Sequence, residues 1–274
     1  MRYELKPLGV GAILDQAIQI FKDRFGLFVV LLLFLRIPAT AVIQYAIFTN
    51  MADLPMQPND AQMNEFFTRI GRIYLYVFAP SILVDALLIS PITNASLIYA
   101  TSRVYLGEEV GVWQSLQMAL RRYFPFVWTS ILFSVVIFTG TMFCVLPGIL
   151  LFFQFALSMT VTALEPISGF AALGRSRKLM QSAGNTNYIA LFLLLVVLFF
   201  IQGGISATAS LVPQLHLRAL ANALFGSIAI AFATVAQVVF YYSCRCRVEG
   251  FDLLHLARIV AETPIEQPVL QAQG

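Results

Sequence analysis

From Gly9 to Phe48, the pattern of hydrophobic and polar positions predicts an amphipathic helix that continues into a membrane-spanning helix. After Arg24, the run 26–48 is almost wholly apolar and long enough to cross a bilayer. Before it, apolar residues recur at the i, i+3, i+4, i+7 spacing of one helical face, with polar residues opposite. The apolar face consists of Val10, Ile13, Leu14, Ala17, Ile18, Phe21 and Phe25.

Five further apolar runs follow, so the pattern predicts an all-α, polytopic membrane bundle of about six transmembrane helices. The tight link 145–148 holds Pro and Gly, which favours a reversal between adjacent, antiparallel spans. Span four is short, so a half-buried or re-entrant segment is the alternative there. Short helices are also expected over 60–67 and after Asp252. The six predicted spans cover 26–48, 74–99, 125–146, 148–164, 188–211 and 220–243.

Composition agrees with a membrane protein and excludes some partners. Hydrophobic residues make up 59% of the 274 residues and charged ones 11%, against about a quarter in soluble domains. Lys and Arg sit in short clusters at the ends of spans, which does not suggest nucleic-acid binding. Thirteen of them fall on the side of the N-terminus and three on the other, with Arg36 inside span one. This bias predicts that both termini are cytoplasmic.

A helix-plus-hairpin unit is expected to recur three times, over about 9–100, 107–164 and 170–243. Positions Leu14, Ala17, Phe21 and Phe25 correspond to Trp113, Leu116, Leu120 and Phe124, and more weakly to Leu173, Ser176 and Met180. The alternative is chance, because any cytoplasmic connector of a membrane protein tends to be basic and amphipathic. We expect one integral membrane domain over 1–263, with cytoplasmic interfacial helices before each hairpin. The tail 264–274 is expected to be disordered.

The basic clusters predict contact with anionic lipid headgroups, each charge contributing about 1 kcal/mol near the surface. Membrane lipids are therefore the expected partners, and protein partners or a homo-oligomer stay open. The residues expected to face headgroups are Lys22, Arg24, Arg121, Arg122, Arg175, Arg177, Lys178, Arg245 and Arg247.

Two charged residues fall within predicted spans, where charge is costly. Arg36 and Asp85 lie at similar depths on neighbouring antiparallel spans, so we expect an intramembrane ion pair. It is either a structural clamp between helices or part of a substrate or proton pathway. Pro38 and Pro91 break the hydrogen-bond ladders of the same two spans. Amides at Gln44, Gln154, Gln202 and Gln237 read as interhelical hydrogen-bonding groups, with a polar channel lining as the alternative.

No constellation for chemistry is evident, so we expect no catalytic, cofactor-binding or metal site. Cys244 and Cys246 lack the second ligand pair that zinc requires. Glu165, where span four emerges, could begin the next helix or meet Arg175. No nucleotide-binding glycine loop, zinc-protease motif or nucleophile elbow is present.

The chain resembles a bacterial family, the membrane domain attached to some glycerophosphoryl diester phosphodiesterases and its stand-alone relatives. The resemblance rests on five stretches in the same order, covering nearly the whole chain. The resemblance implies the bacterial inner membrane. It does not imply their enzymatic activity. The fused enzymes carry a separate catalytic barrel, and its carboxylates and His have no counterpart in this chain. The stretches are 8–17, 106–108 with 119–122, 146–149, 165–166 with 172–176, and 245–253.

These observations predict a multi-pass membrane protein without catalytic activity, a scaffold that interacts with lipids or proteins. One alternative is a small transporter or exporter component with a polar path near Arg36 and Asp85. Another, resting on resemblance alone, is an accessory to glycerophospholipid-diester metabolism.

Overall fold

The computed structural model describes residues 3, 5–52, 63–182, 184–212 and 214–253, and these are helices joined by short links, without strands. The expected tail 264–274, the start of the 60–67 helix and most of the helix after Asp252 lie outside the described residues. The first half of the chain forms α1 (Val10–Asp23), α2 (Phe25–Leu31), η1 (Leu32–Arg36), α3 (Ile37–Ala52), α4 (Met63–Ile73), η3 (Tyr74–Phe78), α5 (Ala79–Val84), η4 (Asp85–Ile89) and α6 (Ser90–Tyr105).

The second half forms α7 (Val112–Arg121), α8 (Tyr123–Phe143), α9 (Val145–Phe155), α10 (Ser158–Leu164), α11 (Phe170–Gln181), α12 (Asn185–Ser210) and α13 (Leu215–Glu249). Five helices in the described residues are long and apolar enough to cross a membrane. There are six if the pair Phe25–Phe34 and Ile37–Asn50, bent by 53°, forms one span. The predicted all-helical, multi-pass fold is therefore confirmed, and five to six apolar helices of the described residues could provide the about six predicted spans.

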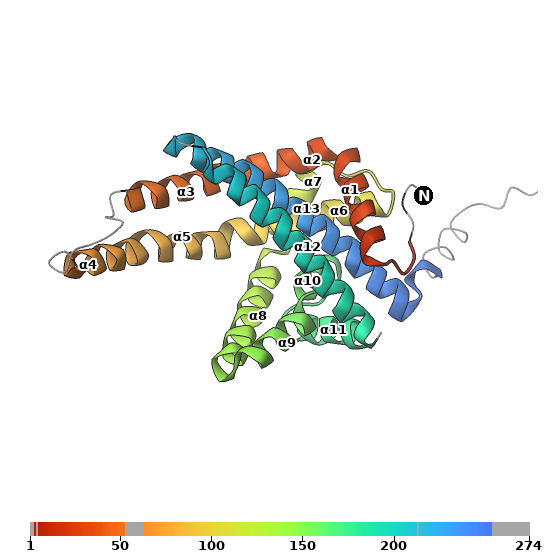
Figure 1. The fold of residues 1–274 in the computed structure, drawn as a ribbon. Helices are drawn as coiled ribbons and strands as arrows, with labels where there is room; N and C mark the ends of the chain where they lie inside the picture. Colours follow the sequence, from red (N-terminus) through yellow and green to blue (C-terminus); the bar gives the residue numbers. More distant parts are fainter. Residues whose placement is uncertain (1–2, 4, 53–62, 183, 213, 254–274) are drawn as a thin grey trace, which may run out of the picture.

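Helix α13 is the centre of the molecule (Figure 1). It packs along α3 and α12 and also contacts α1 and α6. Its C-terminal half carries the large, fully buried side chains Phe240 and Tyr241, which belong to the same hydrophobic core as Phe28 of α2. Gly250 ends the helix in the left-handed conformation (φ 61°), which glycine adopts without strain. In contrast, α4 and α5 run out to one side of the molecule with α3, and none of their residues is buried.

Helices α8 and α9 pack against each other across a one-residue link at Cys144. Two glycines let their backbones approach closely. A Cβ on Gly148 would lie 2.2 Å from Oγ1 of Thr141, and one on Gly140 would lie 2.6 Å from Cδ1 of Leu151. Span four is then interrupted at Ala156 and Leu157, between α9 and α10, although Val145–Leu164 as a whole is long enough to cross a membrane.

The face that α1 buries differs from the predicted one. Ile13, Ala17 and Ile20 are fully buried, whereas Ile18 is exposed and Phe25 falls beyond the break at Arg24. The reason is packing: α1 contacts α13 and α12, so its innermost ridge faces protein. Periodicity identifies an apolar side of a helix but does not give the direction in which the neighbours lie.

Candidate functional site

Each of the two charged residues of the first spans lies in a stretch of π-helix. Arg36 ends η1 and Asp85 begins η4. Each stretch is closed by a hydrogen bond from a backbone N–H to the carbonyl five residues earlier, Ile37 to Leu32 and Ser90 to Asp85. A third stretch, η3, has the same bond from Ala79 to Tyr74. π-Helical turns are rare and are frequent at functional sites.

Proline explains where these turns occur. Pro38, Pro80 and Pro91 each follow a π-helical stretch at the second position after its end. A proline has no N–H to donate and its ring collides with the carbonyl four residues earlier. A wider turn just before the proline relieves that collision. The interruptions of backbone hydrogen bonding that the sequence predicts at Pro38 and Pro91 therefore appear as short π-helical stretches.

The Arg36 side chain is 8% exposed, and its Nε and Nη1 atoms have no hydrogen-bond partner. Asp85 is half-buried and interacts electrostatically with Arg36, but no ion pair within 4.0 Å joins these two described residues. The ion pair thus stays a prediction, and Arg36 is a buried cation that forms no ion pair with another described residue.

The nine basic residues expected to face headgroups fall into two groups. Five are exposed: Lys22, Arg24, Arg121, Arg177 and Lys178. The other four, Arg122, Arg175, Arg245 and Arg247, are partly buried and bind protein groups. The periodicity of the sequence does not indicate which of these basic residues are exposed and which are partly buried.

Three of these partly buried arginines stabilise helix ends and the chain's N-terminal segment. Arg122 donates to the carbonyl oxygens of Thr162 and Glu165 at the C-terminus of α10, where a cation is favoured. Arg247 donates to Oδ1 of Asn187 and to the carbonyl oxygen of Leu8, 3.0 Å away. The Leu8 N–H in turn donates to Oγ of Ser243 at 2.8 Å. Arg245 lies over the Phe251 ring, with 4.1 Å between Cζ and the ring centroid.

Glu165, Arg175, Tyr241, Arg245 and Glu249 form one connected set, which we call the Arg–Glu network. Arg175 pairs with Glu165 at 3.1 Å and with Glu249, and Arg245 pairs with Glu249 at 3.1 Å. Tyr241 donates to Glu165 at 2.7 Å. The hydrogen bonds that Arg175 donates to Glu249 and to Glu165 raise the pKa of Arg175 despite its partial burial. The predicted meeting of Glu165 and Arg175 is confirmed, and the network joins α10, α11 and α13.

Side chains also satisfy the interrupted backbone of span four. Gln237 donates to the carbonyl of Ala156 at 2.9 Å. Ser176 donates to the carbonyl of Gln154 at 2.9 Å and accepts from the N–H of Leu157 at 3.1 Å. An unsatisfied backbone group in a membrane costs several kcal/mol, so these bonds make the break tolerable. Ser176 is the position at which the third copy of the predicted repeat has a polar residue, and these two hydrogen bonds explain why a serine is present there.

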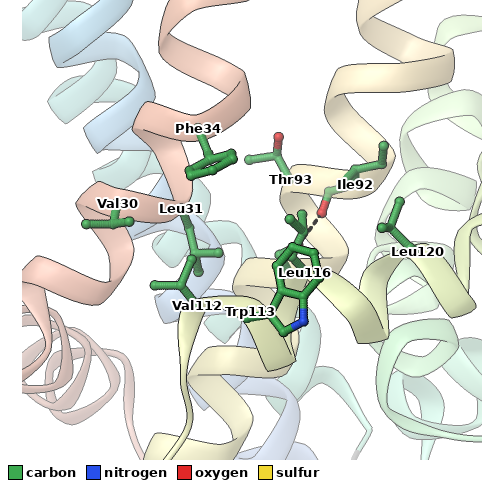
Figure 2. A pocket seen from close by; sticks show the side chains of 10 residues that line it. Val30, Leu31, Phe34, Ile92, Thr93, Val112, Trp113, Leu116 and Leu120 are labelled. Carbon is green, nitrogen blue, oxygen red and sulfur yellow. Dashed lines mark hydrogen bonds between the residues drawn. The ribbon is translucent and has the colours of Figure 1, made fainter.

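Two cavities flank α7. An apolar cavity of about 520 Å³ lies between α2, η1, α6 and α7, and Figure 2 shows the side chains that line it. Its wall includes Thr93, whose buried hydroxyl has no hydrogen-bond partner. A polar cavity of about 310 Å³ is lined by Tyr99, Arg103, Glu108, Glu109, Val110, Gln114, Gln117, Met118 and Arg121. Neither cavity is lined by Arg36 or Asp85.

Within the described residues, no group of three or more His, Cys, Asp or Glu side chains could hold a metal ion. Comparisons of the chain with protein-family models, curated proteins and solved structures returned no match.

Proposed function

We propose that this multi-pass membrane protein is a non-enzymatic scaffold that organises lipids at the inner leaflet of a bacterial inner membrane. The short helices α7 and α11 precede the long apolar helices α8 and α12, and α1 precedes the bent pair Phe25–Phe34 and Ile37–Asn50. The five exposed basic side chains lie in the last two turns of these short helices or directly after them. With both termini cytoplasmic, these charges face the anionic headgroups of the inner leaflet.

Helix α7 is the observation that carries the proposal. Trp113 and Leu120 on one side are 70% and 53% exposed, and Phe124, just past the helix end, is 80% exposed. Gln117 and Arg121 lie on an adjacent side, which lines the polar cavity. An exposed apolar side with an aromatic ring, next to a polar and basic side, is the arrangement of helices that lie in the membrane interface. The small residues Ser115 and Ala119 face α6 and fix α7 in place.

The test is the lipid content of the protein extracted with its native membrane in polymer nanodiscs. We expect anionic lipids to be enriched relative to the bulk membrane. Replacing Lys22, Arg24, Arg177 and Lys178 together by Gln should remove that enrichment, while the matched outer-loop change Arg69→Gln plus Arg72→Gln should leave it unchanged. Equal lipid ratios in nanodiscs of the native chain and in bulk membrane would refute the proposal.

A transporter component is the second candidate, and the buried Arg36, which pairs with no acidic side chain among the described residues, favours it. Intramembrane charge is often part of an ion or substrate path. The two cavities beside α7 do not reach Arg36 or Asp85, however, so the scaffold has the stronger support. A role beside glycerophospholipid-diester metabolism rests on the sequence resemblance alone.

A further inference from the structure

The two cavities beside α7 have opposite chemistry and share one helix. The apolar cavity is enclosed by Phe34, Ile92, Trp113 and Leu116, with α2 and η1 on one side and α6 on the other (Figure 2). The polar cavity is formed by the polar side of α7, the C-terminal turns of α6 and the link between these helices. The two lining sides of α7 adjoin, because Gln117 follows Trp113 by one helical turn, so one amphiphilic molecule can contact both cavities.

The charges in the polar cavity are only partly neutralised within the protein. Arg103 pairs with Glu108 and lies over the Tyr99 ring, 5.2 Å from its centroid. Glu109 and Arg121 are both exposed, and neither forms an ion pair with another described residue. The cavity therefore presents one carboxylate and one guanidinium that are free to bind a ligand, which is complementary to a ligand carrying both an ammonium and an anionic group.

We propose that α7 binds one phospholipid with a zwitterionic, primary-amine headgroup. An acyl chain occupies the apolar cavity against Leu116 and Phe34, the phosphate accepts hydrogen bonds from Arg121, and the ammonium donates to Glu109. This inference rests on the proposed function and adds one specific lipid site to the anionic-lipid contacts of the exposed basic side chains.

The chemistry of the two free charges selects among headgroups. Glu109 repels a headgroup that carries only negative charge. A quaternary ammonium has no N–H to donate to the Glu109 carboxylate, so a choline headgroup binds less well than an ethanolamine one. Trp113, exposed beside the apolar cavity, is the amphipathic side chain that commonly sits at headgroup level.

Native mass spectrometry of the purified full chain can test the assignment by titration with phosphatidylethanolamine, phosphatidylcholine and phosphatidylglycerol. We expect one phosphatidylethanolamine per chain, bound about tenfold more tightly than the other two. Glu109→Gln should abolish the preference and leave phosphatidylglycerol binding no weaker, whereas Arg121→Gln should weaken all three. Arg72→Gln, which removes an exposed cation of α4 outside both proposed lipid sites, is the matched control and should change nothing.

Binding of soluble glycerophosphoethanolamine, which has the headgroup but no acyl chains, tests whether the site recognises a lipid or only a free zwitterion. We expect it to bind the native chain far more weakly than the lipid, because it leaves the apolar cavity empty. Leu116→Trp, which fills that cavity, should weaken only the lipid; Trp113→Ala serves if that variant does not fold. Equal binding of the soluble headgroup, or an unchanged ethanolamine preference in Glu109→Gln, would overturn the proposal. The anionic-lipid enrichment around Lys22, Arg24, Arg177 and Lys178 is measured separately and does not depend on Glu109.

Discussion

Tyr123 donates a hydrogen bond of 2.6 Å from its hydroxyl to the main-chain carbonyl of Leu87. Leu87 lies four residues before Pro91, so no backbone N–H is present at the position that would normally donate to this carbonyl. Tyr123, the first residue of α8, thus supplies a donor to the carbonyl of Leu87, whose usual backbone donor is missing because of Pro91.

We expect Tyr123→Phe to destabilise the protein by about 1–3 kcal/mol, because it leaves a carbonyl without a donor. Unfolding in detergent, followed by circular dichroism, measures the loss. Pro91→Ala supplies an N–H for Leu87, so Tyr123→Phe should lose most of its effect in that background. An equal loss in both backgrounds would show that the hydroxyl does not act through this carbonyl.

The Arg–Glu network should contribute more to stability than a surface ion pair. Glu249 binds both Arg175 and Arg245, and all three side chains are at most 24% exposed. Glu249→Gln should therefore destabilise by about 2 kcal/mol, since it leaves two partly buried guanidinium groups poorly paired. The matched control is Glu65→Gln, which removes the exposed pair with Arg69 and should change stability by less than about 0.5 kcal/mol. Similar effects of the two substitutions would contradict the network's role.

Close contact between α8 and α9 predicts that Gly148→Ala destabilises by about 1–3 kcal/mol, because the added methyl group collides with Thr141. Gly174→Ala in α11 is the control: nothing lies within 4 Å of its Cβ position, and alanine favours helix by about 1 kcal/mol. The two thermal unfolding midpoints should move in opposite directions. A neutral Gly148→Ala would show that the helices lie farther apart.

For Arg36 and Asp85 we expect the substitutions Arg36→Gln and Asp85→Asn to be nearly additive, with a coupling energy below about 0.5 kcal/mol, because no ion pair within 4.0 Å joins the two side chains. Unfolding of the two single variants and the double variant gives this value. A coupling above about 1 kcal/mol would instead establish the ion pair that the sequence suggests.

The positions of the spans could be predicted from the sequence because each is a long apolar run between polar segments. The partners of individual side chains could not. Arg175 and Arg177 look equivalent in a basic cluster, yet Arg175 binds two glutamates and Arg177 is exposed. That difference depends on how α11 packs against α13. Likewise, Pro91 predicts a disturbed helix, but the donor Tyr123 lies on another span, which periodicity cannot reveal.

The central claim is that α7 lies in the membrane interface with its apolar side against lipid chains. Trp113 and Trp128 are the two tryptophans of the chain, so Trp128→Phe leaves Trp113 as a single fluorescent reporter. In vesicles of lipids brominated at different acyl positions, we predict that bromines near the headgroup quench Trp113 most strongly, with weaker quenching toward the bilayer centre. Quenching of Trp113 by aqueous iodide but not by any brominated lipid would contradict the account.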